Sequence, residues 1–430
     1  MKNENTLYWL WLSLKCGVAS KDFNRLIEKY EDPFELYRLE EAEIEQFAGL
    51  GKTVKEKLCE KDLDKAYDIL KYCKQEKVDI ISYGDSRYPE RLRELEAPPV
   101  LLYCKGHFPD FNTRLCIGVV GTRDMSEYGK QSAYKIACEL SGAGVITVSG
   151  MAKGIDGVAA CGALTAGGQT VAVLGCGIDR VYPSEHKKLM SEIIRHGAVI
   201  TEYPPKEAPH GYNFPKRNRI ISGLCQGVLV VEAPVGSGAL ITAKDAIGQG
   251  RELFAVPGNI DDANAKGPNE LIKDGAYAVL SSADILSHYG FLYGDTYDER
   301  ALSSAKKKSD SVNSALKKYG LSYALSIKTR ELELPIEIPA ETEKKETAKT
   351  QSTEPPVAAE PIKTEDNKAL LEGLDPLTRK IFEALPVDRA VSADAVVGDG
   401  ISTAEAITSL TVLELQGLVS SLPGGLYIRK

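Results

Sequence analysis

The sequence predicts an α/β protein whose central domain is a doubly wound, extended Rossmann-like parallel sheet. Short apolar runs begin at about residue 115, and glycine-containing turns separate them from segments of helical periodicity. Strands that are apolar throughout are typical of parallel sheets, because helices cover both faces of such sheets. The seven expected strands are Cys116–Val120, Val145–Val148, Val171–Leu174, Ala198–Thr201, Val228–Val231, Leu253–Val256 and Ala276–Leu280.

A small helical domain is expected before this core, over residues 1–80. Leu7–Leu14 has the composition of the first turns of a buried helix, and short amphipathic patterns follow it. The turn glycine Gly51 leads into a lysine-rich helix, as in helix-hairpin-helix and SAM-like units. A plain helical packing module explains these residues equally well, and the sequence leaves the choice open.

Two segments of different composition follow the Rossmann-like core, which is expected over residues 81–290. Residues 291–366 become rich in Glu, Lys, Thr and Pro, a composition that predicts a flexible linker. Residues 367–430 recover helical periodicity and end in a turn and a short strand, which predicts a winged-helix-like domain. Its candidate recognition helix, Ser402–Gln416, contains no cation, so protein and DNA both remain open as partners of the wing.

The composition is that of a cytoplasmic globular protein with a formal net charge of −8. The nine cysteines are odd in number and form no Cys-x-x-Cys pair, which favours buried free thiols over disulfides or a zinc site. No metal site is therefore expected. No apolar run approaches the roughly 18 residues of a membrane span, so we expect no membrane association.

The turns after the first two strands have the features of anion sites. Ligands of doubly wound sheets lie beyond the carboxyl ends of the strands. After the first strand, Gly121 allows backbone N–H groups to approach a ligand, and Arg123 adds a bidentate phosphate donor. After the second strand, Gly150 precedes Lys153. A third glycine in register and an acidic residue at the end of the second strand are both missing, which disfavours a dinucleotide cofactor.

A cluster of cations, Phe-Pro-Lys-Arg-Asn-Arg-Ile-Ile at 214–221, stands out in this acidic chain. Lys216, Arg217 and Arg219 precede an expected helix at Ile220–Leu224, where cations oppose the helix dipole. A bound polyanion would explain their position, with Phe214 stacking on a base. The alternative is structural: Phe214 belongs to the core and Asn218 caps the helix. Another anion-binding turn is expected where Gly236, Ser237 and Gly238 precede a helix.

The ordered blocks of the core resemble the DNA-processing protein A (DprA, or Smf) family. The blocks are VVGTR, SGMAKGID, AVLGCGID, TEYPP, FPKRNRIISGL, VEAPVGSGALITA, QGRELFAVPG and GPNELIKDGA, and the likeness is dense over about residues 80–288. It implies a non-enzymatic single-stranded DNA-binding protein of natural transformation and recombination. Such proteins protect incoming strands, load the RecA recombinase, form homodimers through the core and use no nucleotide cofactor.

The resemblance and the turn analysis together define the expected nucleic-acid-binding residues. They are Gly121, Thr122, Arg123, Gly150, Lys153, Phe214, Lys216, Arg217, Asn218, Arg219, Ser237 and Gly238. Three positions depart from the family pattern: Thr122 replaces a serine, Lys153 replaces an arginine, and Ala160 stands where a histidine is usual. We therefore expect no catalytic residue at position 160.

An enzymatic alternative is a Rossmann-like nucleoside-monophosphate phosphoribohydrolase. In that hypothesis Gly236–Gly238 hold a phosphate, while Glu202 or Glu232 takes part in cleaving the glycosidic bond. The proline-double-glycine turn typical of those enzymes is absent from Val235–Ala239, and the cationic 214–221 segment has no counterpart in them. The sequence therefore favours the DNA-binding hypothesis.

Overall fold

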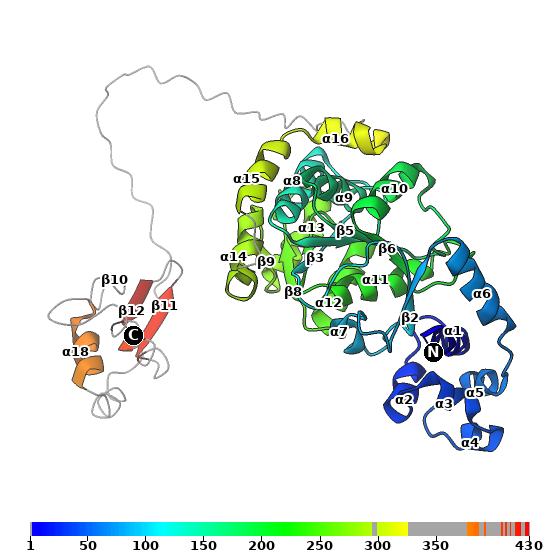
Figure 1. Cartoon of the computed structure of the whole chain (residues 1–430). Helices are drawn as coiled ribbons and strands as arrows, with labels where there is room; N and C mark the ends of the chain where they lie inside the picture. The colour runs from blue at the N-terminus through cyan, green and yellow to red at the C-terminus, as the bar shows by residue number, and fades with distance from the viewer. Residues whose placement is uncertain are drawn as a thin grey trace, which may run out of the picture. The chain divides into compact units, whose positions relative to one another are not determined.

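The computed structural model contains two compact units, residues 1–334 and residues 335–430, which are described separately (Figure 1). The structure describes residues 2–294, 299–325, 376–386, 391–392, 406, 409–410, 413, 418–422 and 426–429.

Six helices form the N-terminal part of the first unit. Helix α1 (Lys2–Cys16) buries Leu7, Leu10 and Leu12, which confirms the expected buried helix. Gly51 is the N-cap of α5, as its place before a lysine-rich helix predicts. The other helices are α2 (Asp22–Lys29), α3 (Pro33–Arg38), α4 (Glu41–Glu45), α5 (Lys52–Cys59) and α6 (Asp64–Gln75).

A nine-stranded, mostly parallel sheet forms the core, with the order β1-β2-β6-β5-β4-β3-β7-β8-β9. All seven expected strands are present, with bounds within about two residues of those predicted. Strands β1 and β2 were missed; β1 lies at the edge of the sheet, and the antiparallel β2 joins it to β6. The strands are β1 (Asp79–Ser82), β2 (Leu101–Gly106), β3 (Cys116–Val120), β4 (Ile146–Ser149), β5 (Thr170–Val173), β6 (Ala198–Thr201), β7 (Gly227–Val230), β8 (Glu252–Ala255) and β9 (Tyr277–Ala278).

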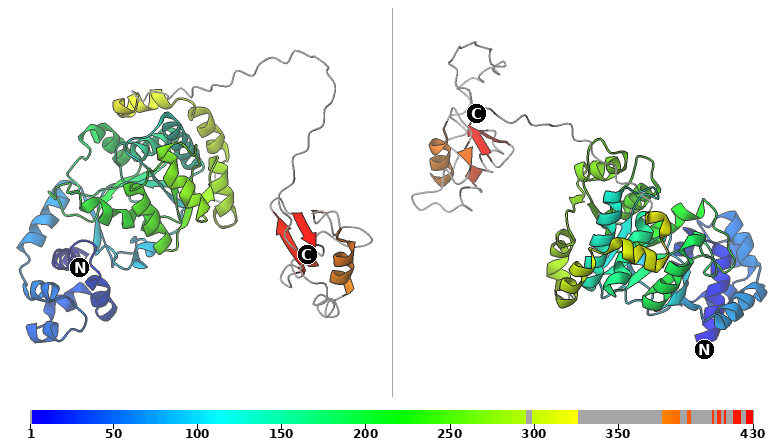
Figure 2. Two further views of the ribbon diagram at one scale, coloured as in Figure 1. Left: turned by 180° about the vertical axis from the view of Figure 1, so that it is seen from behind. Right: turned by 90° about the horizontal axis from the view of Figure 1, so that it is seen from above.

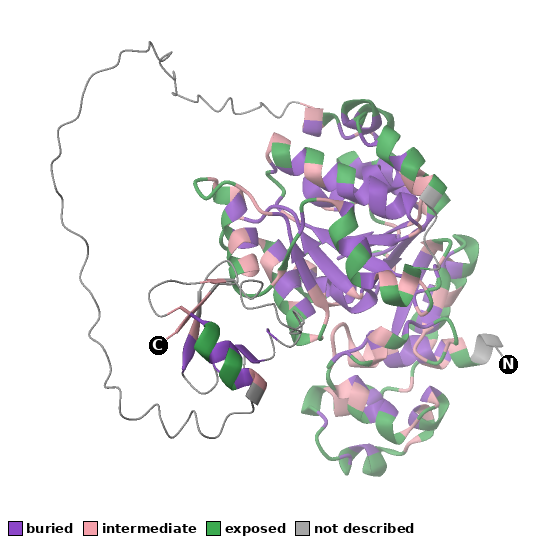
Figure 3. Ribbon diagram, turned by 90° about the vertical axis from the view of Figure 1, so that its left-hand side faces the viewer, coloured by how far each residue is buried: buried purple, intermediate pink, exposed green. Residues whose placement is uncertain are grey.

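Helices cover both faces of this sheet, as a doubly wound fold requires (Figures 1 and 2). In Figure 1, α8 (Glu127–Gly142), α9 (Ile155–Ala166) and α10 (Lys187–His196) lie above the sheet. On the opposite face lie α11 (Asn213–Leu224) and α12 (Gly238–Gly248). The strands between them are buried (Figure 3). The order of the chain reverses at β3, since β4 lies on one side of it and β7 on the other.

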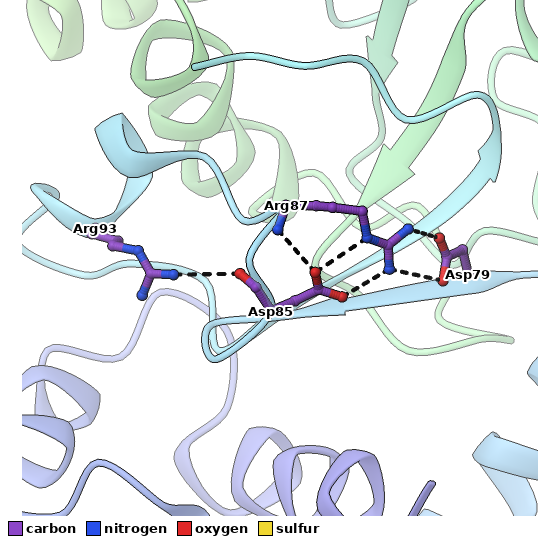
Figure 4. Close-up of polar contacts among 4 residues, drawn as sticks. All are labelled: Asp79, Asp85, Arg87 and Arg93. Atoms are coloured by element: carbon purple, nitrogen blue, oxygen red, sulfur yellow. Dashed lines mark hydrogen bonds and ion pairs between the residues drawn. The ribbon is translucent and has the colours of Figure 1, made fainter. Parts of the chain in front are cut away.

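Short elements complete the connections of the core, and an ion-pair cluster fixes the segment before β2. The guanidinium of Arg87 binds Asp79 at 2.5 Å and Asp85 at 2.7 Å, while Arg93 donates to the backbone oxygen of Asp85 (Figure 4). These bonds connect strand β1 to the loop that follows it. The short elements are α7 (Glu90–Arg93), η1 (Ser184–His186), η2 (Ala263–Ala265) and α13 (Lys266–Lys273).

The start of the expected linker is wrong, because residues 299–325 are helical. Helices α14 (Ser282–Tyr293), α15 (Glu299–Lys308) and α16 (Val312–Tyr319) and the short η4 (Ser322–Leu325) follow the sheet. Val312, Leu316 and Tyr319 are buried against the core at helical spacing. The neighbouring lysines and serines had concealed this apolar pattern. The remainder of the expected linker, residues 326–366, lies outside the described residues.

The second unit has the strand arrangement expected of a winged helix. Helix α18 (Pro376–Ala384) packs through Ile381 and Phe382 on a small core that includes Leu410 and Leu413. Strands β10 (Val391–Ser392), β12 (Leu426–Arg429) and β11 (Val419–Leu422) form an antiparallel sheet in that order. Most of the expected recognition helix lies outside the described residues. Throughout the described parts of both units, no helix is long and apolar enough to span a membrane.

Candidate nucleic-acid interface

A groove of about 650 Å³ lies at the carboxyl ends of β3 and β7, where the chain order reverses. This is the place at which doubly wound sheets bind ligands. We call it the switch-point groove; its lining includes Gly121, Thr122, Arg123, Asp156, Tyr182, Phe214, Arg217, Asn218, Ser237 and Gly238. A side cavity of about 60 Å³ shares Arg123, Tyr182, Phe214 and Arg217 with it and adds Gly150 and Lys153.

Arg123 is the exposed cation of the groove. It follows β3 directly, and its guanidinium carbon lies 5.8 Å from the centre of the Phe214 ring. In the described part of the chain its side chain has no ion pair or hydrogen bond. A guanidinium in this state is available to bind a phosphate in bidentate fashion.

Arg217, in contrast, is a structural residue beneath the groove. Its side chain is only 5% exposed, and Nη1 donates to the carbonyl oxygens of Gly150, at 2.9 Å, and Val173. A Cβ atom at position 150 would clash with this guanidinium, which explains the glycine there. Burial lowers the pKa of Arg217, an effect that the nearby charge of Asp156 opposes. Arg217 therefore joins the ends of β4 and β5 and presents little charge to solvent.

Asp156 was not predicted as a site residue, although it is a buried residue of the groove lining. Its carboxylate accepts a hydrogen bond from the Gly150 N–H at 2.8 Å, and the N–H groups of Ala152 and Gly121 also stabilise its charged form. Burial raises the pKa of Asp156, against the influence of Arg217. The N–H groups of Gly121 and Gly150, expected to bind an external anion, thus already stabilise this carboxylate.

The single basic patch predicted at 214–221 is not formed. Helix α11 begins at Asn213, so the cations lie inside the helix and not ahead of it. Successive helical residues point about 100° apart. Lys216 consequently lines a separate cavity of about 280 Å³ beside the N-terminal helices, whereas Arg219 is mostly buried and paired with Glu202. Of the three cations, only Arg217 lines the groove.

An aromatic pair forms one wall of the groove. The rings of Tyr182 and Phe214 lie 5.2 Å apart at 30°. Phe214 is half-buried and packs closely on Gly175, whereas Tyr182 is 38% exposed. Tyr182 was not among the predicted site residues; its place in the turn after β5, followed by Pro183, is the signal that could have identified it.

The other predicted residues make local bonds at the groove. Ser237 caps α12 by accepting a hydrogen bond from the Ala239 N–H at 3.3 Å. Asn218 donates to the Gly238 carbonyl, also at 3.3 Å, and so connects α11 to the start of α12. This bond differs from the helix-capping role considered for Asn218. Thr122 is buried, and its hydroxyl accepts from the Asp124 N–H at 3.2 Å.

Lys153 is the second accessible cation, but it is paired. Its ammonium lies 2.5 Å from the carboxylate of Glu185, and both side chains are roughly half-exposed. The hydrogen bond from Lys153 lowers the pKa of Glu185 to about 2. Lys153 therefore extends the positive potential of Arg123 into the side cavity, although Glu185 offsets part of it.

The residues proposed for the enzymatic alternative lie apart from the glycine turn. Glu202 binds Arg219 and accepts a hydrogen bond from the Ala19 N–H at 3.2 Å. Glu232 accepts from the Ser126 N–H at 2.8 Å, and neither glutamate lines the groove. Ala160 is buried in α9 and does not line it either. Within the ranges that the structure describes, no cluster of three or more His, Cys, Asp or Glu side chains could hold a metal.

Comparisons with known proteins identify similar chains. A model of the family described as DNA recombination-mediator protein A matches residues 79–290, and one of the DprA winged helix domain matches residues 354–425. Protein Smf of Synechocystis sp. is 30% identical over 438 residues, covering 100% of both chains. DNA processing protein DprA of Bacillus subtilis is 40% identical over 217 residues, 50% of this chain and 73% of that protein. The X-ray structure of Streptococcus pneumoniae DprA matches with a TM-score of 0.58 and 36% identity, covering 66% of this chain and 97% of the other.

Proposed function

Because the chain belongs to the DNA recombination-mediator protein A family, we propose that it binds single-stranded DNA in the switch-point groove. The observation that carries this proposal is the pairing, in one groove, of an unpaired guanidinium with an exposed aromatic ring. Arg123 supplies the contact to a phosphate, and Tyr182 supplies the surface for a base. Single-strand binders combine these two elements, since every base has a face that can stack.

The geometry of the groove favours an unpaired strand over a duplex. A volume of about 650 Å³ is of the size that holds drug-sized ligands, which is enough for a nucleotide to enter. A base inside a duplex is stacked on its neighbours and must be unpaired at a cost of a few kcal/mol before it can contact Tyr182. A strand that is already single avoids this cost.

Fluorescence anisotropy with labelled oligonucleotides of equal length tests the proposal. We expect the full-length protein to bind a single strand more tightly than the same sequence as a duplex, at each salt concentration. Equal affinity for the two forms, or a preference for the duplex, would contradict the proposed function.

Replacing Tyr182 by leucine should weaken binding of a single strand by about tenfold, because base–aromatic stacking contributes about 1–3 kcal/mol per base. Tyr182→Phe, which keeps the ring, is the matched control and should bind normally. An abasic strand of the same length distinguishes phosphate contacts from base stacking, since it retains the phosphates without the bases. If Tyr182→Leu weakened binding of both strands equally, the ring would not be a stacking surface.

We extend the proposal to the finer roles of the family: protection of incoming strands during natural transformation, loading of the RecA recombinase, homodimerisation through the core, and a cytoplasmic location. For the homodimer, exposed apolar side chains at the edge strand β9 give support, namely Tyr277 in the strand at 47% and Leu280 just after it at 81% exposure. Sedimentation of wild type and Leu280→Glu tests the dimer; an unchanged mass would remove this surface from the proposal. Direct binding to purified RecA tests the second partner.

The phosphoribohydrolase alternative is not favoured. Its two candidate glutamates are engaged with Arg219 and Ser126 and lie outside the groove. Incubation with AMP provides a separate test, in which release of adenine would support the alternative.

A further inference from the structure

The helices that follow the sheet dock beside the side cavity of the groove. Tyr323 of η4 accepts a hydrogen bond from the Gly154 N–H at 3.2 Å, and its hydroxyl lies 3.0 Å from Nε2 of His186. The His186 and Tyr323 rings also stack, with centres 5.7 Å apart. The Lys153 ammonium lies 5.8 Å from the centre of the tyrosine ring. Tyr323, in the short η4 that follows α16, is therefore held next to a cation of the side cavity.

Four lysines lie on the two helix ends that meet at this junction, two on each helix. Lys187 and Lys188 are the first two residues of α10, and Lys317 and Lys318 lie in the last turn of α16. The helices meet at Gly320, where an added Cβ atom would lie 3.4 Å from Cβ of Lys188. All four lysines are exposed, and in the described residues none of them forms an ion pair. We call Lys187, Lys188, Lys317 and Lys318 the lysine strip.

A solvated surface explains this arrangement only in part. Lys317 and Lys318 suit the C-terminal end of a helix dipole, but Lys187 and Lys188 oppose the dipole at the N-terminus of α10. Among the described residues, the two glutamates nearest in sequence to Lys187 and Lys188 are paired elsewhere: Glu185 binds Lys153 and Glu192 binds Arg195. Four like charges on two helix ends that touch, in a chain with net charge −8, create a local field that favours a polyanion.

We propose that the lysine strip contacts the phosphates of the same single strand after it leaves the switch-point groove. The inference rests on the proposed function and extends it from one nucleotide pocket to a longer track. Lys153 connects the groove to the strip. It lines the side cavity of the groove, and its ammonium also lies against Tyr323, which follows α16. The helices after the sheet, which the sequence suggested to be linker, then supply half of this second contact surface.

The test uses the full chain with all four lysines of the strip replaced by glutamine. Binding is measured with strands of about 4 and about 16 nucleotides, the range of site sizes in single-strand binders. Each phosphate contact contributes about 0.7 to the salt slope on single strands. If each of the four lysines contacts one phosphate, we expect the slope for the longer strand to fall by roughly three, while the shorter strand binds as to wild type.

A matched control replaces Lys306, Lys307 and Lys308, three exposed lysines of α15, by glutamine. The control should leave the salt slopes of the shorter and the longer strand unchanged. An unchanged salt slope in the strip variant, or an equal loss of slope in the control, would contradict the proposed contact between the lysine strip and DNA. Neither result would bear on the proposed binding in the switch-point groove. Failure of the wild type to prefer single strands would instead overturn the proposed function itself.

Discussion

Replacing Arg217 by methionine should lower the free energy of unfolding by about 3–5 kcal/mol, the range for leaving a buried charge without the opposite charge near it. Methionine fills similar space but leaves Asp156 buried without its counter-charge. It also removes the donor to the carbonyl oxygens of Gly150 and Val173 at the ends of β4 and β5. Urea denaturation followed by circular dichroism measures the loss. From the sequence alone, Arg217 was expected to contact DNA, so that its replacement would weaken DNA binding only.

Two further variants make this prediction specific. Lys216→Met removes the adjacent but exposed charge and should change stability by no more than about 0.5 kcal/mol. Adding Asp156→Asn to Arg217→Met should recover part of the loss, because the uncompensated carboxylate is then neutral. A fully stable Arg217→Met protein that binds single strands weakly would show that Arg217 is a ligand, contrary to this account.

Replacing Arg123 by glutamine should weaken single-strand binding by about tenfold, since hydrogen bonds to charged groups contribute about 1.5–3 kcal/mol. The salt slope should fall by about 0.7, corresponding to one lost phosphate contact. Stability should be nearly unchanged, because this side chain is exposed and has no ion pair in the described structure. Anisotropy titrations across a range of salt concentrations measure affinity and slope together.

Lys65→Gln is the matched control for Arg123→Gln. Lys65 is an exposed cation of α6 that does not line the groove, and its replacement changes the net charge by the same amount. The control should bind with the wild-type slope. Equal losses in the two variants would mean that net charge, and not the position of Arg123, determines the binding.

Much of the fold could be predicted from the sequence because its strongest signals are local. The seven apolar runs are strands, and the turn after the first of them lies at the chain reversal where the groove forms. Strands β1 and β2 were missed because they form the antiparallel part of the sheet and directly follow the segment that the sequence assigned to helices. The helices at 299–325 were missed because lysines and serines are interspersed with the buried apolar residues there.

The candidate site was harder to predict, because burial depends on partners that are distant in sequence. Helix α11 begins earlier than expected: Pro215 lies in its first turn, where proline is tolerated. This shift distributes the cations around the helix. The acceptors of Arg217 lie on β5 and in the turn after β4, so nothing near position 217 indicates its burial. Asp156 was missed for the same reason, since its donors come from two separate glycine turns.

The location of the bound strand tests the central claim most directly. A single strand that carries 5-iodouracil can be photo-crosslinked to the full-length protein, and the attached peptides identified by mass spectrometry. We predict crosslinks to the peptides that contain Tyr182 and Phe214, whose rings form the aromatic wall of the groove. Crosslinks confined to helices α1–α6 or to the second unit, with none at the groove, would contradict the account.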